Sequence, residues 1–208
     1  MSNVEQIWKN KGETPLEALE RFRVEKGIGN DVPMTYAGRL DPMAEGKLLI
    51  LVGDECKNKE KYLWLDKEYE VEVVLGITTD THDALGMVTS IEPFYKGTIE
   101  QLNLQNYVGK FTQAYPAYSS KAVNGKQLHE LARTNELPDE LPTKEVEIYE
   151  IKELGRVEIS AAELKTRIFE DTNKVKGDFR QEAIKTRWNE VLEQDQLFEM
   201  LKIRVKCS

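Results

Sequence analysis

The chain is organised around one stretch, which reads Tyr36-Ala-Gly-Arg-Leu-Asp-Pro-Met-Ala-Glu-Gly46 and runs directly into the apolar segment Lys47–Gly53. A glycine, an Asp-Pro pair and a second glycine predict a tight loop, because proline fixes its own backbone and pushes Asp41 towards an extended conformation. The loop therefore displays one carboxylate. Taken alone, an aspartate before proline most often caps a helix or closes an Asx turn, so this loop leaves a structural and a chemical role for Asp41 both open.

Three further stretches follow in the chain. They are Lys67-Glu-Tyr69 with Leu75-Gly76 and Thr79-Asp-Thr-His-Asp-Ala-Leu-Gly86, then Pro116–Lys126 running on to Ala132-Arg133, and finally Val205–Ser208. In this order, the four stretches together resemble the motifs of the TruB branch of pseudouridine synthases, which acts on tRNA. The resemblance covers roughly the whole chain.

The resemblance implies that the protein converts uridine to pseudouridine in the T-arm of tRNA. This reaction breaks the bond from N1 to C1′, turns the uracil over and joins C5 to C1′, and it needs no cofactor and no metal. Asp41 would be the catalytic residue, acting either as a nucleophile or as the electrostatic partner of a sugar cation. The target base must be flipped out of an RNA stack, and Tyr69 would pack beside it.

A local basic surface is the second candidate feature. The net charge of −8 argues against a general polyanion binder, so any RNA site must be local. Between Tyr107 and Arg133, four basic residues stand against the single acid Glu130, with three aromatic residues interleaved. The basic residues are Lys110, Lys121, Lys126 and Arg133, and the aromatic residues are Phe111, Tyr115 and Tyr118. Either this basic loop, about residues 111–135, grips RNA, or it is an ordinary solvated loop with three core aromatics.

The resemblance turns these residues into one expected substrate-binding set. Its members are Tyr36, Arg39, Lys57, Tyr69, Tyr118, Lys121, Lys126 and Arg133. Lys57, Lys59 and Lys61 lie among the acids Asp54, Glu55 and Glu60, a pattern that usually marks only a solvated face.

Length and composition bound the remaining possibilities. With 208 residues, 40% hydrophobic and 32% charged, the chain fits one globular domain, here taken as residues 1–208. No apolar run approaches the ~20 residues of a membrane span, and the first residues lack the features of a signal peptide. A cytoplasmic monomer with tRNA as its partner is expected. Cys56 and Cys207 lie in no metal-binding or redox spacing, so both are interpreted as free thiols.

Local patterns predict an α+β fold, with a mixed, mainly antiparallel sheet flanked by helices as in a pseudouridine-synthase catalytic domain. A capping box at Thr14 starts a helix that ends near Lys26, with Leu16, Leu19 and Phe22 facing the core. Strands are expected at 48–52, 67–75, 88–91, 146–151 and 198–207, and helices at 54–65, 98–107 and twice after Ser160. The last helix, about 178–194, would carry Ala183, Ile184, Trp188, Val191 and Leu192 on one stripe. The stretch 161–195 has no assigned role.

The chain departs from the family pattern at two places. Tyr36 stands where the family usually has His, and Arg39 replaces a small residue, which is more like ribosomal and dual-specificity pseudouridine synthases. The chain also stops at Cys207-Ser208, where the family continues into Gly-Thr-Tyr-Ile-Arg and a C-terminal RNA-binding appendage.

Two explanations of the second departure stay open. If the chain is a fragment, the favoured interpretation, Leu201–Val205 is a strand without its partner and exposes apolar surface or pairs with another copy. Otherwise Arg39 pairs with Asp41 in place of the family's arginine. A non-catalytic RNA-binding or tRNA-folding module and a synthase acting on ribosomal RNA remain the alternative functions.

Overall fold

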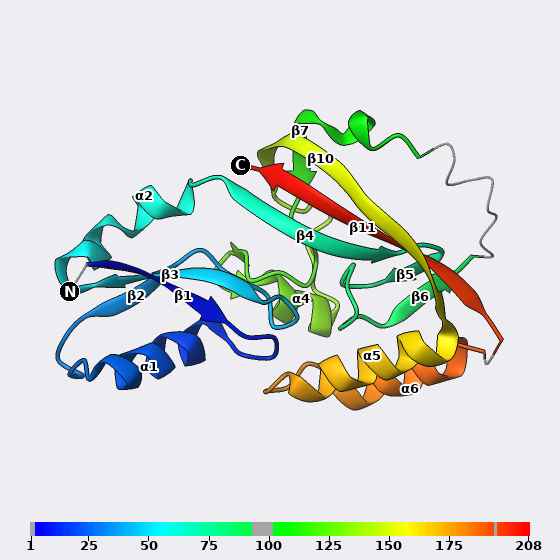
Figure 1. Ribbon diagram of the computed structural model, residues 1–208, viewed down its shortest axis with the longest axis horizontal. Helices are drawn as coiled ribbons and strands as arrows, with labels where there is room; N and C mark the ends of the chain where they lie inside the picture. Colours follow the sequence, from blue (N-terminus) through cyan, green and yellow to red (C-terminus); the bar gives the residue numbers. More distant parts are fainter. Residues whose placement is uncertain (1–2, 93–101, 194) are drawn as a thin grey trace. The chain divides into compact units, whose positions relative to one another are not determined.

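The computed structural model describes residues 3–92, 102–193 and 195–208 (Figure 1). Helices and antiparallel sheets occur together, so the expected α+β class is confirmed. The chain folds into two compact units. The first comprises residues 1–65 and 166–185, and the second comprises residues 66–165 and 186–208.

The first unit is built on a three-stranded antiparallel sheet in the order β1-β3-β2. Its strands are β1 (Val4–Lys9), β2 (Met34–Ala37) and β3 (Gly46–Val52). The helix α1 (Pro15–Lys26) packs on this sheet, because Ala18, Leu19 and Phe22 form one buried cluster with alternate residues of β3. Sequence patterns predicted β3 and α1, but neither β1 nor β2.

The ends of α1 are where the sequence places them. Thr14 and Glu17 form the expected capping box, and Gly27 ends the helix with a φ of 64°. One core assignment was wrong, because Leu16 is 57% exposed and Ala18 is buried instead. Successive residues turn by about 100° around a helix, which places Leu16 beside the stripe centred on Ala18, Leu19 and Phe22.

After β3, the predicted single helix over 54–65 is divided in two. A 3-10 segment, η1 (Gly53–Asn58), is followed by the short helix α2 (Lys59–Leu63). Neither segment has a buried residue, so neither adds to the core of the first unit.

The second unit contains a four-stranded antiparallel sheet in the order β4-β11-β10-β7. Its strands are β4 (Lys67–Val74), β7 (Gly109–Ala114), β10 (Thr143–Ser160) and β11 (Leu197–Cys207). One face is apolar around Ile151, Leu201 and Ile203, whereas the other carries charges such as the Arg204–Glu70 pair at 2.7 Å. The alternation predicted for residues 67–75 and 198–207 therefore corresponds to the two faces of this sheet.

The expectation of an unpartnered last strand is wrong. β11 lies inside the sheet and pairs with β10 on one side and β4 on the other. Leu201 and Ile203 are buried as a result. The partners come from residues 67–74 and 148–160, which are far away in sequence, and strand periodicity carries no information about such pairing.

Smaller elements complete the second unit. The predicted return strand is confirmed as β6 (Val88–Ile91), which pairs with β5 (Ile77–Thr79). The predicted helix over 98–107 lies partly outside the described residues, and its end is the 3-10 segment η2 (Leu104–Tyr107). The basic loop contains the strand pair β8 (Ala122–Val123) and β9 (Lys126–Gln127), followed by α4 (Leu128–Thr134).

The two helices predicted after Ser160 are confirmed as α5 (Ala161–Lys174) and α6 (Gln181–Val191). Ile184 and Trp188 are buried as expected, whereas Ala183 is exposed. The indole nitrogen of Trp188 donates a hydrogen bond to Gly86 O at 3.2 Å, and both residues belong to the second unit. Among the described residues, no helix combines the length and the apolar character that crossing a membrane requires.

Candidate active site

Asp41 lies in the loop that connects the paired strands β2 and β3. The last strand pair before the loop joins Ala37 to Leu49, and Ala44 N donates to Asp41 O at 3.0 Å in the turn that follows. Gly38 adopts a φ of 85°, which only glycine takes without strain. Asp41 itself is exposed. The chain therefore presents its carboxylate at one end of the sheet of the first unit.

A buried lysine holds this loop. Lys9, at the end of β1, is 0% exposed, and its ammonium donates to Ala44 O at 2.6 Å, Asn10 O at 3.1 Å and Asp41 O at 3.2 Å. Burial lowers the pKa of Lys9, while the negative charges of Glu13 and Asp41 act in the opposite direction. A cation that satisfies several carbonyls at once holds the loop backbone in one conformation.

Sequence reasoning missed Lys9, although a weak signal exists. In β1 the inward side of the alternation carries Ile7 and then Lys9, so a lysine stands where an apolar residue is expected. A second contact supports the same loop, because Gly12 N donates to Pro42 O at 2.8 Å. Three carbonyls of the loop, those of Asp41, Pro42 and Ala44, thus accept hydrogen bonds from Lys9 or Gly12.

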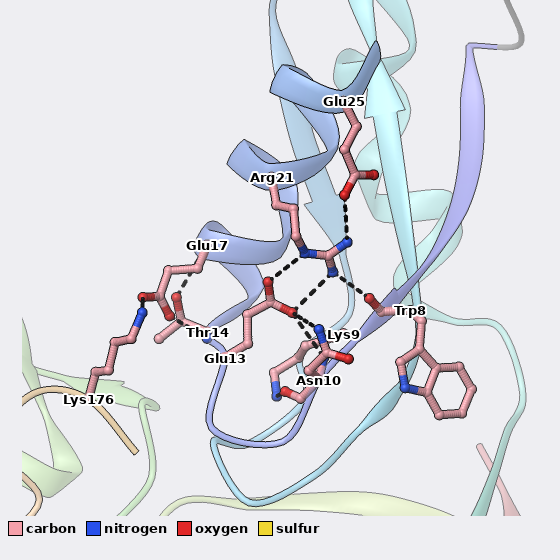
Figure 2. A network of polar contacts seen from close by, with 9 residues as sticks. All are labelled: Trp8, Lys9, Asn10, Glu13, Thr14, Glu17, Arg21, Glu25 and Lys176. Atoms are coloured by element: carbon pink, nitrogen blue, oxygen red, sulfur yellow. Dashed lines mark hydrogen bonds and ion pairs between the residues drawn. The ribbon is translucent and has the colours of Figure 1, made fainter. Parts of the chain in front are cut away.

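Further hydrogen bonds hold the turn over residues 9–13 that contains Lys9 and Gly12 (Figure 2). Glu13 accepts hydrogen bonds from Arg21 Nε at 2.9 Å and from Asn10 N at 2.9 Å, while Arg21 Nη2 donates to Trp8 O at 2.7 Å. The hydrogen bond from Arg21 is the main reason why the pKa of Glu13 lies below its ordinary value. The turn is therefore held between β1 and α1.

Three other expected site residues lie in the first unit. Tyr36 is half-buried in β2, and Lys59 Nζ lies 5.1 Å from the centre of its ring. Arg39 is exposed in the Asp41 loop. Lys57 forms a 2.6 Å pair with Asp54, and its side chain is 80% exposed. The structure thus places Lys59, and not Lys57, beside a candidate aromatic residue.

Tyr69 lies in β4 of the second unit, opposite Val205 on the apolar face of the sheet. It is 39% exposed, so it is not a fully buried core tyrosine. An aromatic ring with one open side is suited to stacking on a base.

The basic loop is more ordered than its composition suggests. His129 N donates to Ser119 O and Leu128 N donates to Lys121 O, which ties the loop to the start of α4. Leu128 and Leu131 are buried beneath it. Tyr118 is half-buried, whereas Phe111 is 42% exposed and is not a core residue.

Two lysines converge on one aromatic ring of this region. Lys121 Nζ and Lys144 Nζ lie 5.1 Å and 5.8 Å from the centre of the Tyr115 ring. Sequence reasoning missed Lys144, which lies outside the window that was weighed for charge and reaches Tyr115 through the pairing of β10 with β7. Lys126 instead pairs with Glu136 at 3.1 Å, and both of these side chains are mostly exposed. Arg133 is exposed on α4.

The expected site residues therefore fall into two groups. Tyr36, Arg39, Asp41 and Lys57 belong to the first unit, and Tyr69, Tyr118, Lys121, Lys126 and Arg133 belong to the second. Among residues 3–92, 102–193 and 195–208, no three His, Cys, Asp or Glu side chains come together as a metal site would require.

An antiparallel α+β fold with an aspartate loop between two paired strands, together with a separate basic and aromatic loop, is the arrangement expected of a pseudouridine synthase. Residues 28–174 match the family described as TruB family pseudouridylate synthase (N terminal domain). This match covers well over half of the chain. The chain therefore belongs to the TruB family.

Curated relatives agree with this assignment. The chain is 35% identical over 157 residues to tRNA pseudouridine synthase B of Oceanobacillus iheyensis, which covers 73% of the chain and 50% of the relative. It is 33% identical over 159 residues to the protein of the same name from Listeria innocua, covering 76% of the chain and 51% of the relative. The chain spans about half the length of the curated relatives it matches.

Proposed function

We propose that this chain isomerises uridine to pseudouridine in tRNA, with the T-arm uridine as its target and Asp41 as its catalytic residue. One observation carries the proposal. Within a TruB-family chain, the exposed carboxylate stands on a loop whose backbone is fastened by a buried lysine and by Gly12. Such anchoring is expected of a catalytic group, because a reacting atom has to be held in a narrow range of positions.

The chemistry asks Asp41 to act on a uridine that has left its stack. Asp41 would attack the sugar or the base edge as a nucleophile, or stabilise a sugar cation by its charge. Bound RNA would exclude water from the loop and so strengthen the electrostatic effect of the carboxylate. The partly open ring of Tyr69 would stack on the flipped base, which offsets part of the few kcal/mol that unstacking costs.

The basic loop would hold the RNA backbone in this proposal. Lys121 and Lys144 bring two positive charges close to the ring of Tyr115, and both lysines are exposed. Clustered ammonium groups are suited to binding phosphates, and aromatic residues beside them are typical of surfaces that bind RNA. Lys126 and Arg133 would extend the contact, Lys126 after release from Glu136. Exposed ion pairs of this kind contribute only ~0–1 kcal/mol, so Lys126 loses little free energy when it leaves Glu136 for a phosphate.

Further parts of the proposal concern partners and surroundings. tRNA is the proposed partner, the chain acts as a monomer, and no cofactor takes part. Action on tRNA would place the protein in the cytoplasm.

The test is a turnover assay on unmodified tRNA transcripts, with pseudouridine mapped at single-nucleotide resolution. Pseudouridine in the T-arm with the wild-type chain, and none with Asp41→Asn, is the expected result. A ribosomal RNA fragment serves as the competing substrate. Faster modification of that RNA would show that the chain acts on ribosomal RNA and not on tRNA. If the chain binds tRNA equally well with and without Asp41 and never modifies it, a non-catalytic RNA-binding module replaces the proposed enzyme.

A further inference from the structure

The helical hairpin formed by α5 and α6 has no part in the function proposed so far. Its tip, residues 171–176, belongs to the same compact unit as β1, α1 and the Asp41 loop. Three separate contacts join this hairpin tip to residues 11–17. Of residues 11–17, Gly12 donates a hydrogen bond to the Asp41 loop, and Lys11 directly precedes Gly12 in the chain.

The first contact is an ion pair between Lys11 and Asp171. Lys11 Nζ lies 2.8 Å from Asp171 Oδ2, and the aspartate side chain is only 19% exposed. Lys174 Nζ contacts the other oxygen of the same carboxylate at 2.9 Å. Burial acts to raise the pKa of Asp171, but the hydrogen bonds from Lys11 and Lys174 outweigh it and the pKa lies below its ordinary value. A half-buried pair of this kind is screened less by solvent than an exposed one.

The second contact is backbone packing at Gly12. A Cβ atom at this position would lie 2.5 Å from Lys174 O, which is closer than two such atoms can approach, and the φ of Gly12 is +84°. The hairpin tip therefore touches the backbone of Gly12 directly. From the same residue the amide donates to Pro42 O at 2.8 Å, one residue beyond Asp41. Gly12 thus lies between Lys174 and the Asp41 loop.

The third contact reaches the start of α1 (Figure 2). Lys176 Nζ lies 2.8 Å from Glu17 Oε1, and the other oxygen of Glu17 accepts from Thr14 N at 2.8 Å. The hydrogen bond from Lys176, followed by that from the Thr14 backbone, lowers the pKa of Glu17 to about 2. The Lys176 side chain is 75% exposed, so this contact is the weakest of the three.

We infer that the hairpin tip is a positioning element for the Asp41 loop, with Lys11 and Asp171 as its positioning residues. It acts through Gly12, whose two sides contact Lys174 and Pro42. An ordered Gly12 keeps its hydrogen bond to the loop, and the loop keeps the Asp41 carboxylate at one place. The inference deepens the proposed function and rests on it for the catalytic part, whereas the mechanical link between hairpin and loop stands without it.

Two substitutions and a matched control test the mechanical link. Lys11→Ala and Asp171→Ala remove the half-buried pair, while Glu182→Ala removes a hairpin ion pair with Lys185 that does not reach residues 11–17. Amide hydrogen exchange is measured at Gly12 and Ala44, with Ile50 in the central strand β3 as the internal reference.

Loss of the pair should accelerate exchange at Gly12 and Ala44 about fivefold, with Ile50 unchanged, because only local opening becomes easier. Lys11→Arg, which keeps the charge, should restore slow exchange, and Glu182→Ala should match the wild type. Unchanged exchange at Gly12 and Ala44 in both alanine variants would overturn the inference. Equal acceleration at Ile50 would show general destabilisation and would overturn it too.

The catalytic consequence is read separately on unmodified tRNA. We expect Lys11→Ala to lower kcat about fivefold with KM changed less than twofold, since the pair touches no substrate. A normal kcat despite faster exchange would refute the positioning role. If the wild-type chain shows no turnover while exchange responds as expected, the proposed function fails and the link between hairpin and loop is retained. The two failures are therefore distinguishable.

Discussion

The Asp41 loop and the basic loop are held in different ways. Buried groups directed at the backbone fasten the first, namely Lys9 on the carbonyls of Asp41 and Ala44 and the Gly12 amide on Pro42. The lysines of the second are exposed and contact an aromatic ring or a surface carboxylate, as Lys121 and Lys126 do. Buried contacts hold a group in one place, whereas exposed contacts exchange easily for a ligand. This difference supports the proposal that the first loop carries the catalytic group and the second binds RNA.

The largest effect should come from the carboxylate of the first loop. Asp41→Asn keeps the size and the backbone contacts of the residue but removes the anion, so we expect turnover to fall by ~10³-fold or more with tRNA affinity nearly unchanged. Single-turnover kinetics and filter binding measure the two quantities. Activity within about tenfold of wild type would show that the Asp41 loop, although it is held by buried groups, carries no essential catalytic group.

The next effect concerns the lysine beneath that loop. Lys9→Met leaves the carbonyls of Asp41 and Ala44 without their donor, so unfolding free energy should fall by about 1–3 kcal/mol. Turnover should fall as well, because the loop is no longer fixed. Urea denaturation measures the stability. The control is Lys47→Met on the exposed side of β3, which should leave stability within about 0.5 kcal/mol of wild type; equal losses at both positions would contradict the role of Lys9.

A smaller effect is expected in the basic loop. Lys121→Ala and Lys144→Ala should each weaken tRNA binding severalfold and lower the slope of log affinity against log salt by roughly one. Folding should be unaffected, because both lysines are exposed. Lys152→Ala, on the charged face of the second sheet, is the matched control. A salt slope that stays constant in the Lys144 variant would remove it from the RNA contact.

The smallest effect is a pH dependence at the start of α1. The pKa of Glu17 is lowered from 4.5 to about 2, so its ionised form stabilises the fold above pH 4.5, and this contribution is lost as the pH falls towards 2. Glu17→Gln should reduce the change of stability across this window, because it lowers stability above pH 4.5 and changes it little near pH 2. Thermal unfolding between pH 2 and pH 5 checks the expectation. Identical pH profiles for the two proteins would show that Lys176 and Thr14 do not hold this carboxylate.

Features that depend on neighbouring residues could be predicted from the amino-acid sequence. The capping box at Thr14, the end of α1 at Gly27, the alternation in β4 and β11 and the loop around Asp41 are all encoded within a few residues. Local sterics, capping hydrogen bonds and side-chain periodicity act over this range, so patterns can predict them. The family motifs were recognisable for the same reason, because each motif is a short continuous stretch.

Contacts between residues far apart in the chain became known from the three-dimensional structure alone. Lys9 reaches a loop more than thirty residues away, Lys144 joins Lys121 at Tyr115, and β11 is inserted between β4 and β10. The hairpin tip likewise meets residues 11–17 across roughly 160 positions of sequence. No local preference specifies such contacts, because they depend on how sheets and helices pack once the chain has collapsed. A lysine in a strand or after a loop looks the same in sequence whether it is solvated or buried beneath a functional group.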